Sequence, residues 1–415
     1  MAEAFLPPKL NPLLVWVFRL CRPLIYGAAL DNFRVEISKD DLALLKSVKD
    51  QRLLLLPNHP SADDPFVMFE VSRQMGTMFN YVAAREVFDC VKGLQGWFFQ
   101  QMGVYSVIRG KADRESFAMT RHKLVSGERP LVIFIEGEVS YENDDLIPFQ
   151  PGVLQLAFKA QEELVKLYKD DPPGILVAPV GIKYIYGPYI EEVLKESLTE
   201  LETEMGLGQP EDQDDITVRI RRIAMKILET HEARALMPSV EDGVSLNERI
   251  DRVRERLLTD METFLHMTVK PETVFLDRIR NVRNEIDRRI FQYQDESNLS
   301  PYDQNMVDYL RRTYEEFVED LERLVNFMTL KDGYLNKETS PERLAEVIIR
   351  FQREVFGKIK LKHPRTAKVV IGECQSLKNL MEPYQADKRG TAETMAQDLE
   401  QEMMGLLERA RTLEI

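Results

Sequence analysis

Cysteine is scarce in this sequence. The 415 residues include three cysteines, Cys21, Cys90 and Cys374, and no two of them have the CxxC spacing of a zinc or redox site. Single cysteines so far apart exclude the disulfide framework on which small secreted domains depend. The sequence therefore indicates a protein of a reducing compartment, in which the cysteines pack as small apolar residues.

Positive charge is also in deficit. The chain has 55 Lys and Arg residues against 69 Asp and Glu residues, which gives a formal net charge of −14. Binding to nucleic acid needs a basic footprint for the phosphates. No basic stripe with interleaved aromatic residues compensates for the acidic balance, so we expect no nucleic-acid partner. A membrane surface is not excluded, because a local apolar and basic patch is sufficient for it.

The third absence is an apolar run of the roughly 20 residues that span a bilayer. The strongest apolar segment, Pro12–Tyr26, is interrupted by Arg19, Arg22 and Pro23. Because Trp16 lies beside these arginines, the segment predicts an interfacial anchor, and hence a peripheral or monotopic membrane protein on the cytoplasmic side. The alternative is a core helix that packs on the rest of the fold.

A histidine and an aspartate five residues apart form the most informative pattern in the chain. His59 and Asp64 follow the apolar run Leu53–Leu56, which predicts a buried strand. Pro60 ends this strand and Pro65 suits the start of a helix, so we expect His59 on a loop and Asp64 at the helix cap. If the loop bends, the carboxylate orients one imidazole nitrogen and leaves the other free to take a proton from a hydroxyl. The alternative is that Asp64 only caps the helix.

Other apolar runs end in polar or glycine residues in the same way. With residues 58–64, the segments in question are 81–88, 103–110, 131–137 and 177–182. In content and order they resemble the signature blocks of the glycerolipid acyltransferases, the family with an HX4D motif that includes lysophosphatidic acid acyltransferase and tafazzin. Independently of the resemblance, strands of an open α/β sheet deliver such groups to one edge, where ligands gather.

The resemblance implies a reaction and a set of site residues. His59, oriented by Asp64, would act as general base for direct acyl transfer to a glycerol hydroxyl. Arg109 would bind the phosphate of a lysophospholipid, and Glu136 with Gly137 would complete the acceptor site. The acyl donor would be acyl-CoA or acyl carrier protein, and no metal or cofactor is implied. The residues themselves leave open that Glu136 forms a structural ion pair with Arg109.

One block departs from the family pattern. Glu138, Val139 and Ser140 follow Gly137, whereas lysophosphatidic acid acyltransferases usually have threonine and arginine there. Tafazzin-like members also lack that arginine and share the paired Asp63 and Asp64. The acceptor therefore stays open between lysophosphatidic acid and another lysophospholipid.

The whole sequence predicts an α/β fold in which a mixed central sheet, flanked by helices, is interrupted by a large all-helical insertion. The β-branched run Lys368–Glu373 resembles the closing strand of the family, and an amphipathic helix over 392–411 should pack on the sheet. Between them and the fourth block lie helical stripes such as Leu246–Leu258. The predicted parts are an interfacial segment at 1–35, the main acyltransferase part at 36–185, the insertion at 186–365 and the closing part at 366–415.

Two other functions remain open. The first is a catalytically silent membrane-bound scaffold whose helical insertion binds a partner, which the unusual Glu138 and Val139 favour. The second is a lipase that uses water, but Ser61 is not part of a Gly-x-Ser-x-Gly elbow. The insertion itself has no catalytic constellation, because His231 and His266 are isolated from any metal-ligand spacing.

Overall fold

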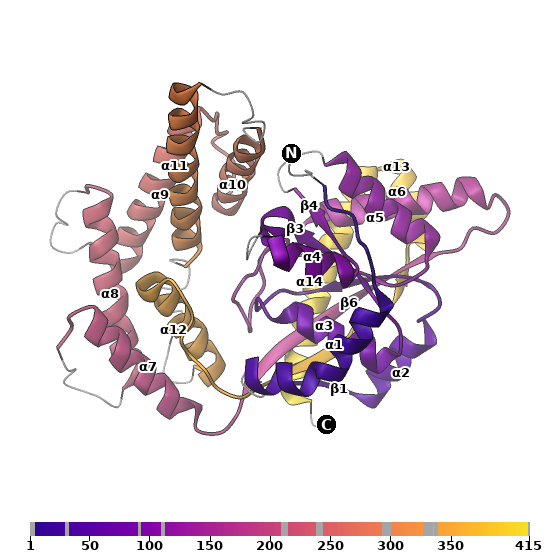
Figure 1. Cartoon of the computed structure of the whole chain (residues 1–415), viewed down its shortest axis with the longest axis horizontal. Coiled ribbons are helices and arrows are strands. Elements are labelled where there is room, and N and C mark those ends of the chain that lie inside the picture. Colours follow the sequence, from indigo (N-terminus) through magenta and orange to yellow (C-terminus); the bar gives the residue numbers. More distant parts are fainter. Residues whose placement is uncertain are drawn as a thin grey trace. The chain divides into compact units, whose positions relative to one another are not determined.

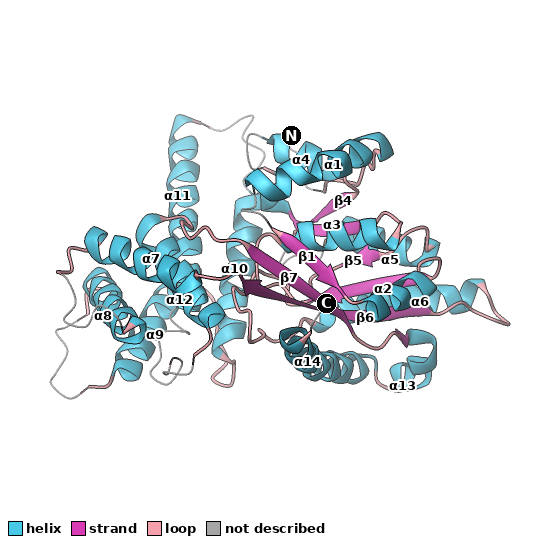
Figure 2. Cartoon of the chain, turned by 90° about the horizontal axis from the view of Figure 1, so that it is seen from below, coloured by secondary structure: helices cyan, strands magenta, loops and turns pink. Residues whose placement is uncertain are grey.

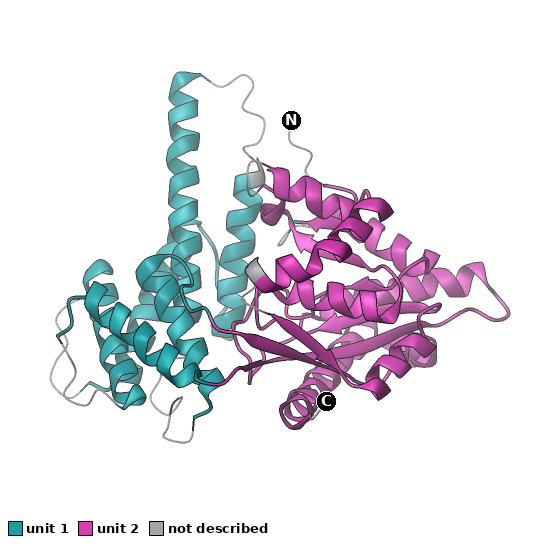
Figure 3. Ribbon diagram, turned by 60° about the horizontal axis from the view of Figure 1, so that its bottom comes forward, with its two compact units in different colours: residues 1–4, 108–112, 189–362 teal, residues 5–107, 113–188, 363–415 magenta. Residues whose placement is uncertain are grey.

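The computed structural model describes residues 5–29, 33–89, 93–108, 113–208, 215–237, 244–292, 300–326, 335 and 339–413. The chain divides into two compact units (Figure 3). The sheet unit consists of residues 5–107, 113–188 and 363–415, and the helical unit of residues 1–4, 108–112 and 189–362. The sheet unit thus includes the N-terminal segment, and it resumes at residue 363 after the helical unit.

The described strands of the sheet unit, eight in number, form one mixed sheet (Figure 2). Its order is β1-β7-β6-β2-β5-β3-β4, with β8 paired to β6. The central strands are parallel, while β7 runs antiparallel to β6 and closes the sheet toward β1. This confirms the predicted mixed sheet. The strands are β1 (Arg34–Ile37), β2 (Arg52–Pro57), β3 (Asn80–Ala84), β4 (Val104–Val107), β5 (Leu131–Val132), β6 (Ile175–Tyr186), β7 (Arg365–Ile371) and β8 (Gln375–Ser376).

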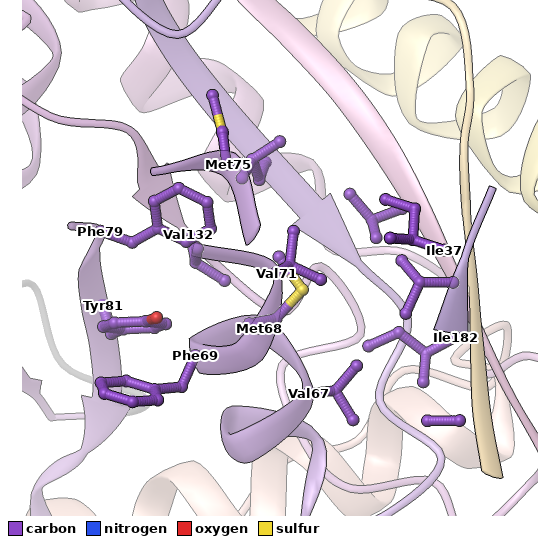
Figure 4. Packing of buried hydrophobic residues seen from close by; sticks show 14 of the residues in the cluster. Ile37, Val67, Met68, Phe69, Val71, Met75, Phe79, Tyr81, Val132 and Ile182 are labelled. Atoms are coloured by element: carbon purple, nitrogen blue, oxygen red, sulfur yellow. The ribbon is translucent and has the colours of Figure 1, made fainter. Parts of the chain in front are cut away.

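The strand β2 is buried on both faces, which explains its unbroken run of leucines. Leu53 and Leu55 pack into one hydrophobic cluster, and Leu54 and Leu56 pack into a second cluster on the opposite face. This alternation follows from the period of two in a strand. Figure 4 shows the first cluster, in which side chains of α3 pack with those of neighbouring strands.

The strand predicted over residues 131–135 is shorter than expected. Only Leu131 and Val132 form β5, although Ile133 and Ile135 still donate backbone N–H groups to β2, at 3.1 and 3.2 Å. The chain then leaves the ladder because it turns at Gly137, whose N–H bonds the carbonyl of Phe134 at 3.1 Å. The end of this block is therefore a loop at the edge of the sheet.

Helices cover both faces of the sheet (Figure 2). The first cluster includes residues of α1 (Pro12–Leu24), α2 (Lys39–Ser47) and α3 (Asp64–Met75), with α4 (Leu94–Gln101) against it. The second includes α5 (Arg114–Ser126), α6 (Pro151–Leu167), α13 (Met381–Ala386) and α14 (Lys388–Thr412). Short η helices lie at Ile25–Ala29, Arg85–Phe88 and Leu377–Leu380. The predicted C-terminal helix is present as α14, which buries Met395, Leu399, Met403 and Leu406 along one face.

The helix α1 has one packed face and one exposed face. Val15 is buried, and Phe18 contacts aromatic rings of α3 and α4. Arg19 and Arg22 also face the protein, since Arg22 binds Glu70 at 2.9 Å and Arg19 donates to a backbone carbonyl after α3. The exposed face is apolar and consists of Leu13, Trp16, Val17, Leu20 and Leu24. The packed face agrees with the alternative of a helix that packs on the rest of the fold, and the interfacial anchor stays a prediction.

The helical unit is a chain of packed helices (Figure 1). They are α7 (Ile190–Glu204), α8 (Ile216–Arg234), α9 (Leu246–Phe264), α10 (Phe275–Gln292), α11 (Pro301–Asn326) and α12 (Pro341–Phe356). Ser245 caps α9, and the predicted stripe of that helix faces inward, with Ile250, Val253 and Leu258 fully buried. His231 is buried and binds Glu354 at 2.9 Å. In the described part of the chain, no helix has the length and apolar character needed to cross a membrane.

Candidate functional site

The site begins where β2 ends, at the carboxyl edge of the parallel strands. β2 lies between β6 and β5 and stops at Pro57. The next residue, Asn58, is fully buried, and its side-chain amide forms hydrogen bonds to β6 like those that a strand backbone would form. It accepts the N–H of Ile182 at 2.7 Å and donates to the carbonyl of Ile182 at 3.0 Å. These two bonds to β6 fix the point at which His59 leaves the sheet.

His59 and Asp64 meet across a tight bend, as the sequence predicted. The Nδ1 atom of His59 lies 2.7 Å from Oδ2 of Asp64. A carboxylate only accepts, so Nδ1 carries the proton and Nε2 of the neutral ring has a free lone pair. Asp64 is fully buried, and its Oδ2 also accepts the N–H of Ser61 at 2.9 Å. The helix cap is Asp63, not Asp64 as predicted, because the Asp64 carboxylate turns toward His59 and away from the helix N–H groups.

The segment 131–140 holds His59 from the other side. The backbone N–H of His59 donates to Oε1 of Glu136 at 2.6 Å. Its carbonyl accepts the N–H and the hydroxyl of Ser140, at 2.9 and 3.2 Å. The ring of Phe134 stacks on the imidazole, with 4.0 Å between centroids and 17° between planes. His59 is therefore held at its backbone, its ring face and Nδ1, which leaves Nε2 as the reactive atom.

Glu136 is a buried acid within this loop, with 1 % of its surface exposed. Its Oε2 accepts the N–H of Ile147 at 3.2 Å, so both oxygens bind backbone. The pKa of Glu136 is raised to about 8, mainly by burial and in smaller part by the nearby Asp64, against the opposing effect of the N–H bonds from His59 and Ile147. Gly137 has a φ of +81°, a conformation that favours glycine and makes the turn after Glu136.

The His59–Asp64 pair and the loop that holds it lie in a segment of the chain that matches a known family. Residues 36–183 match the model of the family described as Acyltransferase. The chain contains an acyltransferase domain. No curated protein matches the chain. The match covers the strands from β1 into β6, and the structure adds to this acyltransferase domain the strand β7 from beyond the helical unit.

Four of the five predicted site residues lie together in the acyltransferase domain. His59 binds both Asp64 and Glu136 directly, and Gly137 follows Glu136 in the same loop. Arg109 lies outside the described residues, two positions beyond the end of β4 at Val107. Among the residues that the structure describes, no three His, Cys, Asp or Glu side chains form a cluster that could hold a metal ion.

Two residues of the site were missed by sequence reasoning. The hydroxyl of Tyr184 on β6 donates to Oδ1 of Asp64 at 2.6 Å. Arg365, the first residue of β7, forms an ion pair with Asp63, and its guanidinium lies 4.7 Å from the centre of the Tyr184 ring. Alternation along β6 marks Tyr184 as facing the same side as Ile182, which is a usable but weak signal. Arg365 has no local signal, because 302 residues separate it from Asp63.

Proposed function

We propose that this acyltransferase moves a fatty acyl group from an acyl thioester to a glycerol hydroxyl of lysophosphatidic acid or another lysophospholipid, in phospholipid biosynthesis or remodelling. The observation that carries the proposal is the 2.7 Å bond from Nδ1 of His59 to Asp64, which leaves Nε2 as a base. Ser61 is not part of a Gly-x-Ser-x-Gly elbow, so the proposed nucleophile is a hydroxyl brought by the substrate.

The reaction follows from the orientation of His59. Nε2 takes the proton of the glycerol hydroxyl while its oxygen attacks the thioester carbonyl. The C–S bond then breaks, and the leaving thiolate takes the proton back from the imidazolium. Asp64 keeps its bond to Nδ1 and stabilises the positive charge that develops on the ring. General base catalysis of this kind contributes roughly 10²–10⁴ in rate.

The proposed acceptor and donor rest on the resemblance to the glycerolipid acyltransferases. Arg109 would hold the acceptor phosphate through its planar guanidinium. Glu136 and Gly137 would border the acceptor, and the two backbone bonds of Glu136 support a further role in holding His59. Acyl-CoA or acyl carrier protein would supply the thioester, with no added metal or cofactor.

A panel assay tests this function. The full chain is mixed with labelled acyl-CoA or acyl carrier protein and with lysophosphatidic acid, headgroup-bearing lysophospholipids or glycerol 3-phosphate. We expect transfer to one lysophospholipid class, with a loss of at least about 10²-fold in His59→Ala. The matched control is His122→Ala, because His122 is an exposed histidine of α5 in the same unit. A folded wild type that acylates no acceptor would instead support the scaffold alternative.

Membrane association is the second part of the proposal. We propose that a lipid surface binds the exposed apolar face of α1 together with the exposed residues of α4, in a peripheral or monotopic mode on the cytoplasmic side. Tryptophans favour the membrane interface, and each helix exposes one. The supporting residues are Leu13, Trp16, Val17, Leu20 and Leu24 on α1 with Leu94 and Trp97 on α4.

Vesicle flotation tests the membrane proposal. The double variant Trp16→Asp with Leu20→Asp should lose most binding to phospholipid vesicles, because it places two charges in the apolar face. Met404→Asp is the matched control, since Met404 is an exposed apolar residue on α14, against the other face of the sheet. Equal flotation of both variants and the wild type would refute the assignment of this face.

A further inference from the structure

The carboxylate that orients His59 is itself held by a phenol. Tyr184 lies on β6 with 3 % of its surface exposed, and its hydroxyl donates to Oδ1 of Asp64 at 2.6 Å. The other oxygen of Asp64 takes Nδ1–H of His59 and the N–H of Ser61. Among the described residues, the buried Asp64 carboxylate thus has three donors, of which Tyr184 is the side chain other than His59.

We propose that Tyr184 is a positioning residue of the reaction, which sets both the orientation of Asp64 and the negative charge that Asp64 presents to His59. This inference rests on the proposed function, in which His59 is the base. A hydroxyl that donates to a carboxylate draws negative charge away from it, and in a buried site this effect is not screened by water. His59 then meets a weaker acceptor than an Asp64 with a free oxygen would be.

Tyr184 is suited to donate across the whole working range of pH. Burial, with a smaller effect from the negative Asp64, raises the pKa of Tyr184 well above its ordinary value of 10. The phenol consequently keeps its proton, and its oxygen cannot become a second anion beside Asp64. A phenol that stays protonated at this position can lower the negative charge that Asp64 presents to His59 without taking part in proton transfer.

The surroundings of Tyr184 aim its hydroxyl. Its backbone N–H donates to the side chain of Asn143 at 2.7 Å, and its carbonyl accepts from the same side chain at 2.9 Å. The Arg365 guanidinium covers the ring and binds Asp63, the neighbour of Asp64. A tyrosine that only filled space would not need a cation on its ring and a fixed backbone.

The other charged groups near the pair come from three elements. They are Asp63 at the start of α3, Arg365 on β7 and Glu136 in the loop after β5. All three groups are kept in the variants that are compared. The inference therefore concerns the difference between two proteins that share these groups.

The test compares Tyr184→Phe with Tyr105→Phe. Both remove one buried hydroxyl from the sheet unit, but that of Tyr105 bonds Thr120 at 2.8 Å. Without its phenol donor, Asp64 presents more negative charge to His59 and favours the protonated ring. We expect the acidic limb of kcat/KM to move to higher pH by about one unit in Tyr184→Phe, a tenfold change in the dissociation constant. Tyr105→Phe should keep the wild-type limb.

A second readout does not need activity. The full chain is labelled with 15N-histidine, the His59 signal is assigned with His59→Ala, and its titration curve should shift in the same direction. If no acceptor is acylated but this curve still shifts, the proposed function fails, and only the coupling of Tyr184 to the His59–Asp64 pair remains. If transfer occurs and Tyr184→Phe has the same limb and curve as Tyr105→Phe, the inference is overturned.

Two further variants guard against a folding defect. 3-Fluorotyrosine placed at 184 is a stronger donor of nearly the same shape, so it should shift the His59 curve to lower pH. In an Asp64→Asn background, Tyr184→Phe should produce no further shift, because the carboxylate through which it acts is gone. A downward shift with fluorotyrosine supports the inference, and an unchanged or upward shift refutes it.

Discussion

The buried acid Glu136 allows a sharp prediction about stability and pH. The perturbation is Glu136→Gln, which removes the ionisable group and keeps the shape. The glutamine oxygen can still accept the N–H of His59, but the amide nitrogen then faces the N–H of Ile147. Two donors that face each other leave one buried group unpaired, which costs about 1–3 kcal/mol at every pH.

In the wild type, ionisation of the buried Glu136 destabilises the folded state, and this cost depends on pH. The folded pKa of Glu136 is raised, from 4.5 to about 8, because burial disfavours the carboxylate. The contribution of Glu136 to the free energy of unfolding is therefore fully present below pH 4.5, where the side chain is protonated in both states. It declines as the pH rises from 4.5 to 8 and is lost above about 8. A shift of about 3.5 units corresponds to about 5 kcal/mol. We expect the wild type to be more stable than Glu136→Gln near pH 4.5 and less stable near pH 9.

Urea unfolding at several pH values measures this crossing. Both tryptophans of the chain, Trp16 and Trp97, belong to the sheet unit, so their fluorescence follows the unfolding of that unit. Taking the difference between the two proteins cancels the other titrating groups. Glu382→Gln makes the same chemical change at an exposed position of α13, and its difference from wild type should not cross zero. A difference for Glu136→Gln that stays constant from pH 4.5 to 9 would refute the reasoning.

Three other substitutions test the construction of the site. Asn58→Ala removes both bonds to the Ile182 backbone and should lower the free energy of unfolding by about 2–3 kcal/mol in urea titrations. Gly137→Ala forces a side chain into a positive φ and should cost about 1–2 kcal/mol, visible as a lower Tm. Phe134→Leu removes the ring stacked on His59 and should lower kcat by about 3–10-fold in the acyl transfer assay with little change in Tm. Wild-type stability in the first two variants, or wild-type kcat in the third, would contradict the assigned contacts.

Much of the fold was predictable because its signals are local. The alternating leucines of β2 and the stripe of α9 follow directly from the periods of strand and helix. The bend between His59 and Asp64 was also predictable, since the prolines around it break regular structure. The extent of β5 was not, because it depends on where Gly137 turns the chain away from β2.

The contacts that complete the site join distant segments. Asp64 and Tyr184 are 120 residues apart, and His59 is 81 residues from Ser140. Ser140 follows Glu138 and Val139, the residues found where the family usually has threonine and arginine, and its hydroxyl donates to the carbonyl of His59. The sequence analysis placed Arg19 and Arg22 in a segment predicted to bind a membrane surface. In the structure both side chains face the protein, because their hydrogen-bond partners lie on and after α3.

The sequence by itself determined the strand–loop–helix unit that bears His59 and Asp64, the mixed α/β class and the helical character of the insertion. Only the tertiary structure decided which groups hold that pair: the phenol of Tyr184 from β6, the guanidinium of Arg365 from beyond the helical unit, and the loop of Glu136 and Ser140. The physical reason is that periodicity and turn residues act over a few positions of the chain. Hydrogen-bond partners in a sheet edge are instead chosen by which strands pack side by side.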